Sequence, residues 1–162
     1  MFDPDTQELA THVLALCRAR SWHVATAESC TGGLVAAALT AIAGASDVVD
    51  RGFVTYSNKA KMELLGVPEA TLAAVGAVSA ETTLAMATGA VSRAGVDLAV
   101  SVTGIAGPGG GSAEKPVGLV YLGIATKTTC RSERHVFSDD RDGIRHAALL
   151  RALELLKETA AG

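Results

Sequence analysis

The sequence has 162 residues, which suits a single domain with a sizeable core and leaves little room for a second. Hydrophobic residues make up 49% of the chain but aromatic residues only 4%, so the core has to be built from Ala, Val and Leu. The formal net charge is −3 and Lys and Arg are scattered, which argues against a nucleic-acid-binding protein.

The ends of the chain and its cysteines point to a cytoplasmic protein. The acidic N-terminus lacks the basic and apolar regions of a signal peptide, and no apolar run approaches the ~20 residues that span a bilayer. Cys17, Cys30 and Cys130 are far apart and show no zinc-binding spacing, so we expect reduced thiols. We therefore expect one domain over residues 1–162, with no metal or other cofactor and no contact with nucleic acid or membrane.

Taken in order, the chain alternates between helical and strand patterns. Asp3 followed by Pro4 begins a helix in which Leu9, Val13 and Leu16 recur at helical spacing. We predict helices over residues 4–20, 33–43, 59–65, 68–75, 80–94 and 140–158, a loop over 44–50, and strands over 22–27, 52–56, 97–102, 117–126 and 131–137. This order predicts an α/β fold, a three-layer α/β/α sandwich with a mixed, mostly parallel sheet.

The turn from Ser29 to Gly33 stands between a predicted buried strand and an alanine-rich helix. It puts a hydroxyl and a thiol at the carboxyl end of the sheet, where open α/β folds bind ligands. Unpaired N–H groups at the helix start favour a negative charge beside them. A nucleophile in this position indicates an acyl-transfer site with Ser29 as the nucleophile. Cys30 stays open as an alternative, because a thiolate at a helix start is also reactive.

Lys61 follows the strand at 52–56 and should lie at the same sheet edge as Ser29. With Asn58 as the N-cap, Lys61 occupies the third helical position, where the helix dipole and partial burial both lower its pKa. Neutralising an ordinary lysine at pH 7 costs about 4.6 kcal/mol, which these effects would have to reduce. The alternative interpretation of Lys61 is a solvated surface lysine. Lys61 is the candidate base because we expect surface or packing roles for the four histidines, His12, His23, His135 and His146.

Two further segments could bind an anion. The segment from Thr103 to Ser112 follows a buried strand and is rich in glycine, but it matches neither the P-loop nor the GxGxxG pattern. Its N–H groups could turn towards a phosphate, and a flexible surface loop is the alternative. Arg141 and Arg145 are four residues apart on one helix face, able to reach a phosphate or to pair with nearby acidic side chains.

Four motifs in this order resemble the CinA C-terminal domain family over nearly the whole chain. They are Ala27-Glu28-Ser29-Cys30-Thr31-Gly32-Gly33, Arg51-Gly52-Phe53-Val54-Thr55-Tyr56-Ser57-Asn58 with Lys61, Gly76-Ala77-Val78-Ser79, and Thr103-Gly104-Ile105-Ala106-Gly107-Pro108 with Lys115-Pro116-Val117-Gly118. Stand-alone members of this family are nicotinamide-nucleotide amidohydrolases. The chain departs from the family at Asp139-Asp140-Arg141, where Gly-Asp-Arg is common.

The resemblance implies hydrolysis of nicotinamide mononucleotide to nicotinate mononucleotide and ammonia without a metal. By motif, Ser29 is the nucleophile, Lys61 the base, acting directly or through Tyr56, and Tyr56 a supporting hydroxyl. The residues expected to bind substrate are Thr31, Gly32 and Gly33 at the oxyanion, and Thr103, Gly104, Gly107, Gly109, Gly110 and Arg145 towards the phosphate. Because the family commonly forms oligomers, we expect a homo-oligomer, with a dimer favoured. The alternative function is a non-catalytic nucleotide-binding or regulatory module of the same family.

Overall fold

The computed structural model describes all residues 1–162, in six α-helices, a short 3-10 helix and five strands. The helices are α1 (Pro4–Ala19), α2 (Leu34–Thr40), η1 (Ala45–Asp47), α3 (Asn58–Leu65), α4 (Glu69–Val75), α5 (Ala80–Ala94) and α6 (Arg141–Ala161). The strands are β1 (Val24–Glu28), β2 (Val49–Val54), β3 (Leu98–Gly104), β4 (Leu119–Thr126) and β5 (Cys130–Val136). None of the helices is both long and apolar enough to cross a membrane.

The strands form one mixed sheet in the order β2-β1-β3-β4-β5. β1 pairs in parallel with both β2 and β3, whereas β4 runs antiparallel to β3 and to β5. Four of the five strands therefore share one direction, which confirms the predicted mixed, mostly parallel sheet. The carboxyl ends of β1, β2 and β3 meet at one edge, because Glu28 of β1 is level with Val54 of β2 and Val102 of β3.

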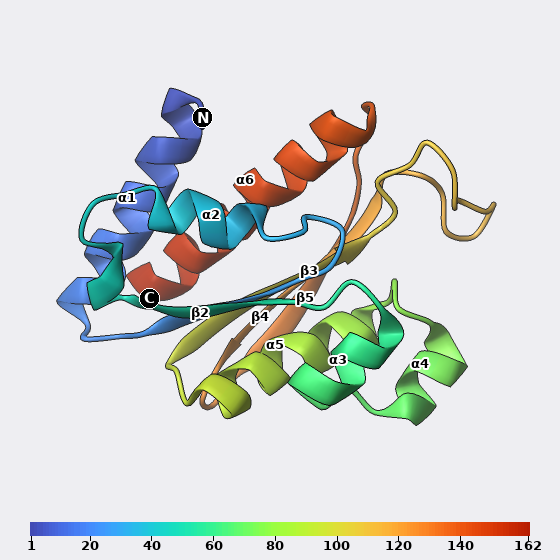
Figure 1. The fold of residues 1–162 in the computed structure, drawn as a ribbon, viewed down its shortest axis with the longest axis horizontal. Helices are drawn as coiled ribbons and strands as arrows, with labels where there is room; N and C mark the ends of the chain where they lie inside the picture. Colours follow the sequence, from blue (N-terminus) through green and yellow to red (C-terminus); the bar gives the residue numbers. More distant parts are fainter.

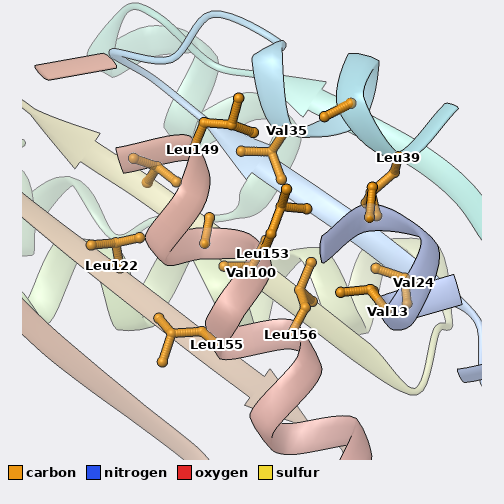
Figure 2. Close-up of a cluster of buried hydrophobic side chains, with 14 of the residues drawn as sticks. Val13, Val24, Val35, Leu39, Val100, Leu122, Leu149, Leu153, Leu155 and Leu156 are labelled. Carbon is orange, nitrogen blue, oxygen red and sulfur yellow. The ribbon is translucent and has the colours of Figure 1, made fainter. Parts of the chain in front are cut away.

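Helices cover both faces of the sheet and confirm the predicted sandwich. In Figure 1, α1, α2 and α6 lie above the sheet, and α3, α4 and α5 lie below it. The core beneath α1, α2 and α6 is the larger of the two and is made of aliphatic side chains, as the low aromatic content requires. Figure 2 shows part of it, with Val13, Val24, Val35, Leu39, Val100, Leu122, Leu149, Leu153, Leu155 and Leu156 labelled.

Helix ends agree with the sequence at several places and differ at one that matters. Asp3 caps α1 as predicted, Ser79 caps α5, and Gly66 ends α3. The N-cap of α3, however, is Ser57, whose Oγ accepts a hydrogen bond from the N–H of Ala60 at 3.0 Å. Asn58 is therefore the first helical residue. This shift places Lys61 at the fourth helical position instead of the third.

The region around β2 also differs from the prediction. Residues 44–50, expected to be a loop, contain η1 and the first residues of β2. The strand begins earlier than predicted because Val49 pairs with Val24 at the start of β1. It ends at Val54, so Thr55 and Tyr56 leave the sheet and lead directly into α3.

Candidate active site

Main-chain hydrogen bonds to neighbouring strands fix the position of Ser29, the first residue after β1. The N–H of Ser29 donates to the carbonyl of Val102 on β3 at 2.9 Å. On the other side, the N–H of Thr55 after β2 donates to the carbonyl of Glu28 at 2.8 Å. Ser29 and Thr55 are both buried. The turn that carries the nucleophile and the turn that leads to Lys61 are therefore joined through the sheet edge.

The Glu28 carboxylate occupies the start of α2. It is fully buried and accepts four hydrogen bonds of 2.9 to 3.1 Å, from Thr26 Oγ1 and from the N–H groups of Gly33, Val35 and Ala36. A carboxylate satisfies the unpaired N–H groups and complements the dipole at this end of a helix. The N–H groups of Gly33, Val35 and Ala36 are therefore occupied by the protein's own carboxylate, so the N–H of Gly33 is not free for the oxyanion as expected.

The amine of Lys61 lies directly beside the Ser29 hydroxyl. Its Nζ is 3.0 Å from Ser29 Oγ, 2.8 Å from the carbonyl oxygen of Thr55 and 3.4 Å from that of Tyr56. Lys61 is 1% exposed, and this burial lowers the pKa of its amine from 10.5 to about 8, against a smaller opposing effect of Cys30. The structure thus brings together the two residues that the sequence analysis selected as nucleophile and base.

The contacts of Lys61 also orient its nitrogen. A neutral amine has two N–H bonds and one lone pair. When the two N–H groups donate to the carbonyls of Thr55 and Tyr56, the lone pair is left for the proton of Ser29 Oγ. In the protonated state the same three oxygens accept all three ammonium protons. The site therefore holds Lys61 in one place through both protonation states.

A cavity of about 290 Å³ opens in front of this pair. Its walls come from the turn after β1, the start of α3, the turn before α5, the glycine-rich loop after β3, and the start of α6. The lining residues are Ser29, Cys30, Tyr56, Lys61, Ala77, Val78, Thr103, Gly104, Ile105, Ala106, Gly107, Gly109, Gly110 and Arg141. The predicted site residues that do not line it are Thr31, Gly32, Gly33 and Arg145.

The glycine-rich loop between β3 and β4 is ordered at its two ends and open in its middle. The N–H of Ile105 donates to the carbonyl of Leu119, the N–H of Gly118 donates to the carbonyl of Ile105, and Lys115 Nζ donates to the carbonyl of Val75 at 2.6 Å. In the first part of the loop, residues 106–111, all five backbone N–H groups lack an acceptor within the protein, those of Ala106, Gly107, Gly109, Gly110 and Gly111. These groups are available to a ligand, as the sequence analysis expected.

Tyr56 and Arg141 lie together at the mouth of the cavity. Arg141 donates from Nη1 to the carbonyl of Gly107 at 2.7 Å and from Nη2 to the hydroxyl of Tyr56 at 3.2 Å. Tyr56 is 63% exposed, and its contact with Lys61 is made by its carbonyl, not by its hydroxyl. The direct contact between Lys61 and Ser29 leaves no gap for the predicted relay through the Tyr56 hydroxyl.

Arg145 lies behind the turn and outside the cavity. Its Nε donates to the carbonyl of Cys30 at 3.1 Å and its Nη2 to the carbonyl of Thr31 at 3.2 Å. Arg145, which the sequence analysis expected to bind the substrate phosphate, does not line the cavity, whereas Arg141 does. The neighbouring carboxylates have structural roles, since Asp140 caps α6 and Asp139 accepts a hydrogen bond from the N–H of Asp140.

The alternative nucleophile and the histidines are poorly suited to catalysis. Burial raises the pKa of the Cys30 thiol to about 11, so this residue is a protonated thiol at neutral pH. His135 contacts Glu133, and His146 lies near Asp3. None of the histidines lines the cavity, and no group of three or more His, Cys, Asp or Glu side chains is arranged to hold a metal ion.

Comparison with known proteins gives matches over nearly the whole chain. The family model described as CinA C-terminal domain matches residues 6–160. The nicotinamide-nucleotide amidohydrolase PncC of Enterobacter agglomerans is 52% identical over 155 residues, which cover 95% of this chain and 94% of that protein. The crystal structure of the competence/damage inducible protein CihA from Agrobacterium tumefaciens superposes with a TM-score of 0.96 at 50% identity, covering 100% of this chain and 99% of that one.

Other relatives are much longer than this chain. A CinA-like protein of Citrifermentans bemidjiense is 50% identical over 157 residues, which are 97% of this chain but only 38% of that protein. Sequence similar to this chain thus makes up nearly the whole of some relatives and only a part of others.

Proposed function

Because this chain belongs to the CinA C-terminal domain family, we propose that it is an amidohydrolase that converts nicotinamide mononucleotide to nicotinate mononucleotide and ammonia. The observation that carries the proposal is the buried contact of 3.0 Å between Lys61 Nζ and Ser29 Oγ at the wall of a cavity. The naming of a relative with 52% identity as a nicotinamide-nucleotide amidohydrolase supports the choice of substrate.

In the first half of the proposed reaction, Ser29 becomes acylated. The lone pair of neutral Lys61 takes the proton of Ser29 Oγ while Oγ forms a bond to the amide carbon. The proton then passes from Lys61 to the amide nitrogen, the C–N bond breaks and ammonia leaves. The product of this half is a nicotinoyl ester of Ser29. With the pKa of Lys61 near 8, about a tenth of the protein is in the neutral, reactive form at pH 7.

In the second half, water resolves the ester. Lys61 removes a proton from the water as its oxygen attacks the ester carbon. The bond between that carbon and Ser29 Oγ breaks, and the proton returns from Lys61 to Ser29. Nicotinate mononucleotide forms as the carboxylic acid and loses its remaining proton to solvent, which gives the carboxylate. The pair of Ser29 and Lys61 is restored to its initial state.

The remaining residues bind the substrate and the developing charge. The N–H groups of Gly32 and Gly33 already donate to the Ser29 carbonyl and to Glu28, so the oxyanion donors in this proposal are the N–H groups of Cys30 and Thr31. The free N–H groups of the glycine-rich loop and the guanidinium of Arg141 hold the phosphate.

The test is ammonia release from nicotinamide mononucleotide by the wild type and by Ser29→Ala, Cys30→Ala and Lys61→Ala, with calorimetric binding measured for each. We expect turnover to be lost in the serine and lysine variants and kept in Cys30→Ala, with binding intact throughout. Wild-type binding without turnover would identify a nucleotide-binding module instead. Loss of turnover in Cys30→Ala alone would make the thiol the nucleophile.

A further inference from the structure

We propose that Arg145 is a positioning residue, which orients the turn after Ser29 so that its free N–H groups can stabilise the oxyanion. This inference rests on the proposed function, because it assigns a role within the same acyl-transfer step. It starts from the two hydrogen bonds of Arg145 to consecutive carbonyls, those of Cys30 and Thr31.

The geometry of the peptide unit links these carbonyls to the N–H groups of the turn. In a planar trans peptide, the carbonyl of one residue and the N–H of the next point to opposite sides. Arg145 draws the carbonyl of Cys30 towards α6, so the N–H of Thr31 points away from α6. The second carbonyl, that of Thr31, belongs to the peptide unit of Gly32, whose N–H donates to the Ser29 carbonyl at 3.0 Å. One guanidinium thus fixes two consecutive peptide planes.

Most N–H groups of the turn after Ser29 are already paired within the protein. The N–H groups of Ser29, Gly32 and Gly33 have acceptors within the protein, in the carbonyls of Val102 and Ser29 and the carboxylate of Glu28. Only the N–H groups of Cys30 and Thr31 remain without an acceptor in this turn. Cys30 is 7% exposed and Thr31 is fully buried. Buried N–H groups are rarely left unpaired, which makes these two the candidates for binding the oxyanion. Cys30 lines the cavity, and Thr31 is the next residue in the chain and does not line it.

The position of Arg145 separates this role from phosphate binding. Two of its three nitrogens are used by the turn, and the third, Nη1, lies 3.8 Å from the carboxylate of Asp142. Arg145 does not line the cavity, whereas Arg141, one helical turn earlier, does. The two arginines are thus matched in chemistry and differ in what they contact. Each serves as the control for the other.

The experiment compares Arg145→Met and Arg141→Met in two reactions. The first is ammonia release from nicotinamide mononucleotide, with kcat and KM determined separately. The second is the burst of p-nitrophenolate from p-nitrophenyl acetate, which carries no phosphate and acylates a serine through an oxyanion. Ser29→Ala supplies the background of the burst, and thermal unfolding confirms that each variant is folded.

We expect Arg145→Met to lower kcat and the burst rate by roughly 100-fold, the effect of losing one oxyanion donor, with KM within about threefold of wild type. Arg141→Met should raise KM for the nucleotide and lower the burst rate far less than Arg145→Met does. Arg145→Lys, which keeps the charge but can reach one carbonyl only, should fall between Met and wild type. A raised KM with a normal burst in Arg145→Met would overturn the proposal and assign Arg145 to the phosphate.

The burst also separates this inference from the proposed function. A wild type that shows the burst but releases no ammonia from the nucleotide would refute the substrate, while the ratio of burst rates would still decide the role of Arg145. A wild type that gives neither a burst nor ammonia release would refute both, since no activated Ser29 would then exist.

Discussion

Replacement of Lys61 by methionine should stabilise the protein at neutral pH and do so in a pH-dependent way. Methionine has a similar length and no charge, so Lys61→Met removes the cost of burying an ammonium group. In the folded protein burial lowers the pKa of Lys61 from 10.5 to about 8, which means that the folded state disfavours the charged form. The loss of hydrogen bonds to the carbonyls of Thr55 and Tyr56 offsets part of the gain at every pH.

The pH-dependent part can be worked out from linkage. Below pH 8 both states of the wild type carry the proton, and the full penalty of about 3 kcal/mol is present. Between pH 8 and about 10.5 the folded state has lost its proton while the unfolded state still binds it. The stability of the wild type therefore rises with pH in this window. The difference in free energy of unfolding between Lys61→Met and wild type, called the gap below, should therefore shrink by about 3 kcal/mol from pH 7 to pH 10.5.

Urea unfolding of both proteins at half-unit intervals from pH 6 to pH 10.5 measures this gap. Other titrating groups are common to both proteins and cancel in the difference. Lys59→Met is the matched control, because it makes the same substitution on the same helix at an exposed side chain. A gap for Lys61→Met that stays constant across this range would refute the lowered pKa, and with it the supply of neutral base.

Three further outcomes are expected. The wild-type kcat/KM should rise about tenfold per pH unit up to pH 8 and then level off, because only neutral Lys61 acts as a base, and a flat profile from pH 6 to 8 would contradict this role. Glu28→Ala should lower the free energy of unfolding in urea by ~3–5 kcal/mol by leaving three N–H groups without an acceptor, and Glu28→Gln by less. Gly89→Ala should lower the free energy of unfolding by ~1–3 kcal/mol although alanine has the better helix propensity, since a Cβ there would lie 2.0 Å from the carbonyl of Leu65. An unchanged midpoint of urea unfolding would show instead that α3 can shift to make room.

The fold could be predicted from the sequence because its signals are local and repeated. Capping residues such as Asp3 and Ser79 and the buried strand before Gly104 mark element boundaries by short-range chemistry. The error at α3 has the same origin. Ser57 and Asn58 are both good N-caps, and the choice between them depends on where Thr55 is tied to β1, a contact between strands that no local pattern contains.

The candidate nucleophile and base were predictable, but their supporting residues were not. Ser29 and Lys61 follow strands that end at one sheet edge, so topology alone brings them close. The roles of Glu28 and Arg145 depend instead on the directions of side chains. A carboxylate next to the nucleophile could face solvent, the cavity or α2, and nothing in its spacing selects α2. Likewise, Arg141 and Arg145 share a helix face in sequence, yet only one of them reaches the cavity.

The geometry of the pair and its reactivity have different physical origins. Hydrogen bonds of the main chain set the distance between the two side chains. The N–H of Ser29 bonds to β3, the N–H of Thr55 bonds to β1, and Lys61 Nζ donates to the Thr55 carbonyl. The reactivity comes from burial, which is the largest cause of the lowered pKa of Lys61. Substitutions of side chains that bury Lys61 should therefore change the fraction of neutral Lys61 more readily than the distance between its Nζ and Ser29 Oγ. A substitution next to Lys61 that admits water should raise the pKa of its amine. The pH profile of kcat/KM should then move to higher pH, with its plateau value unchanged.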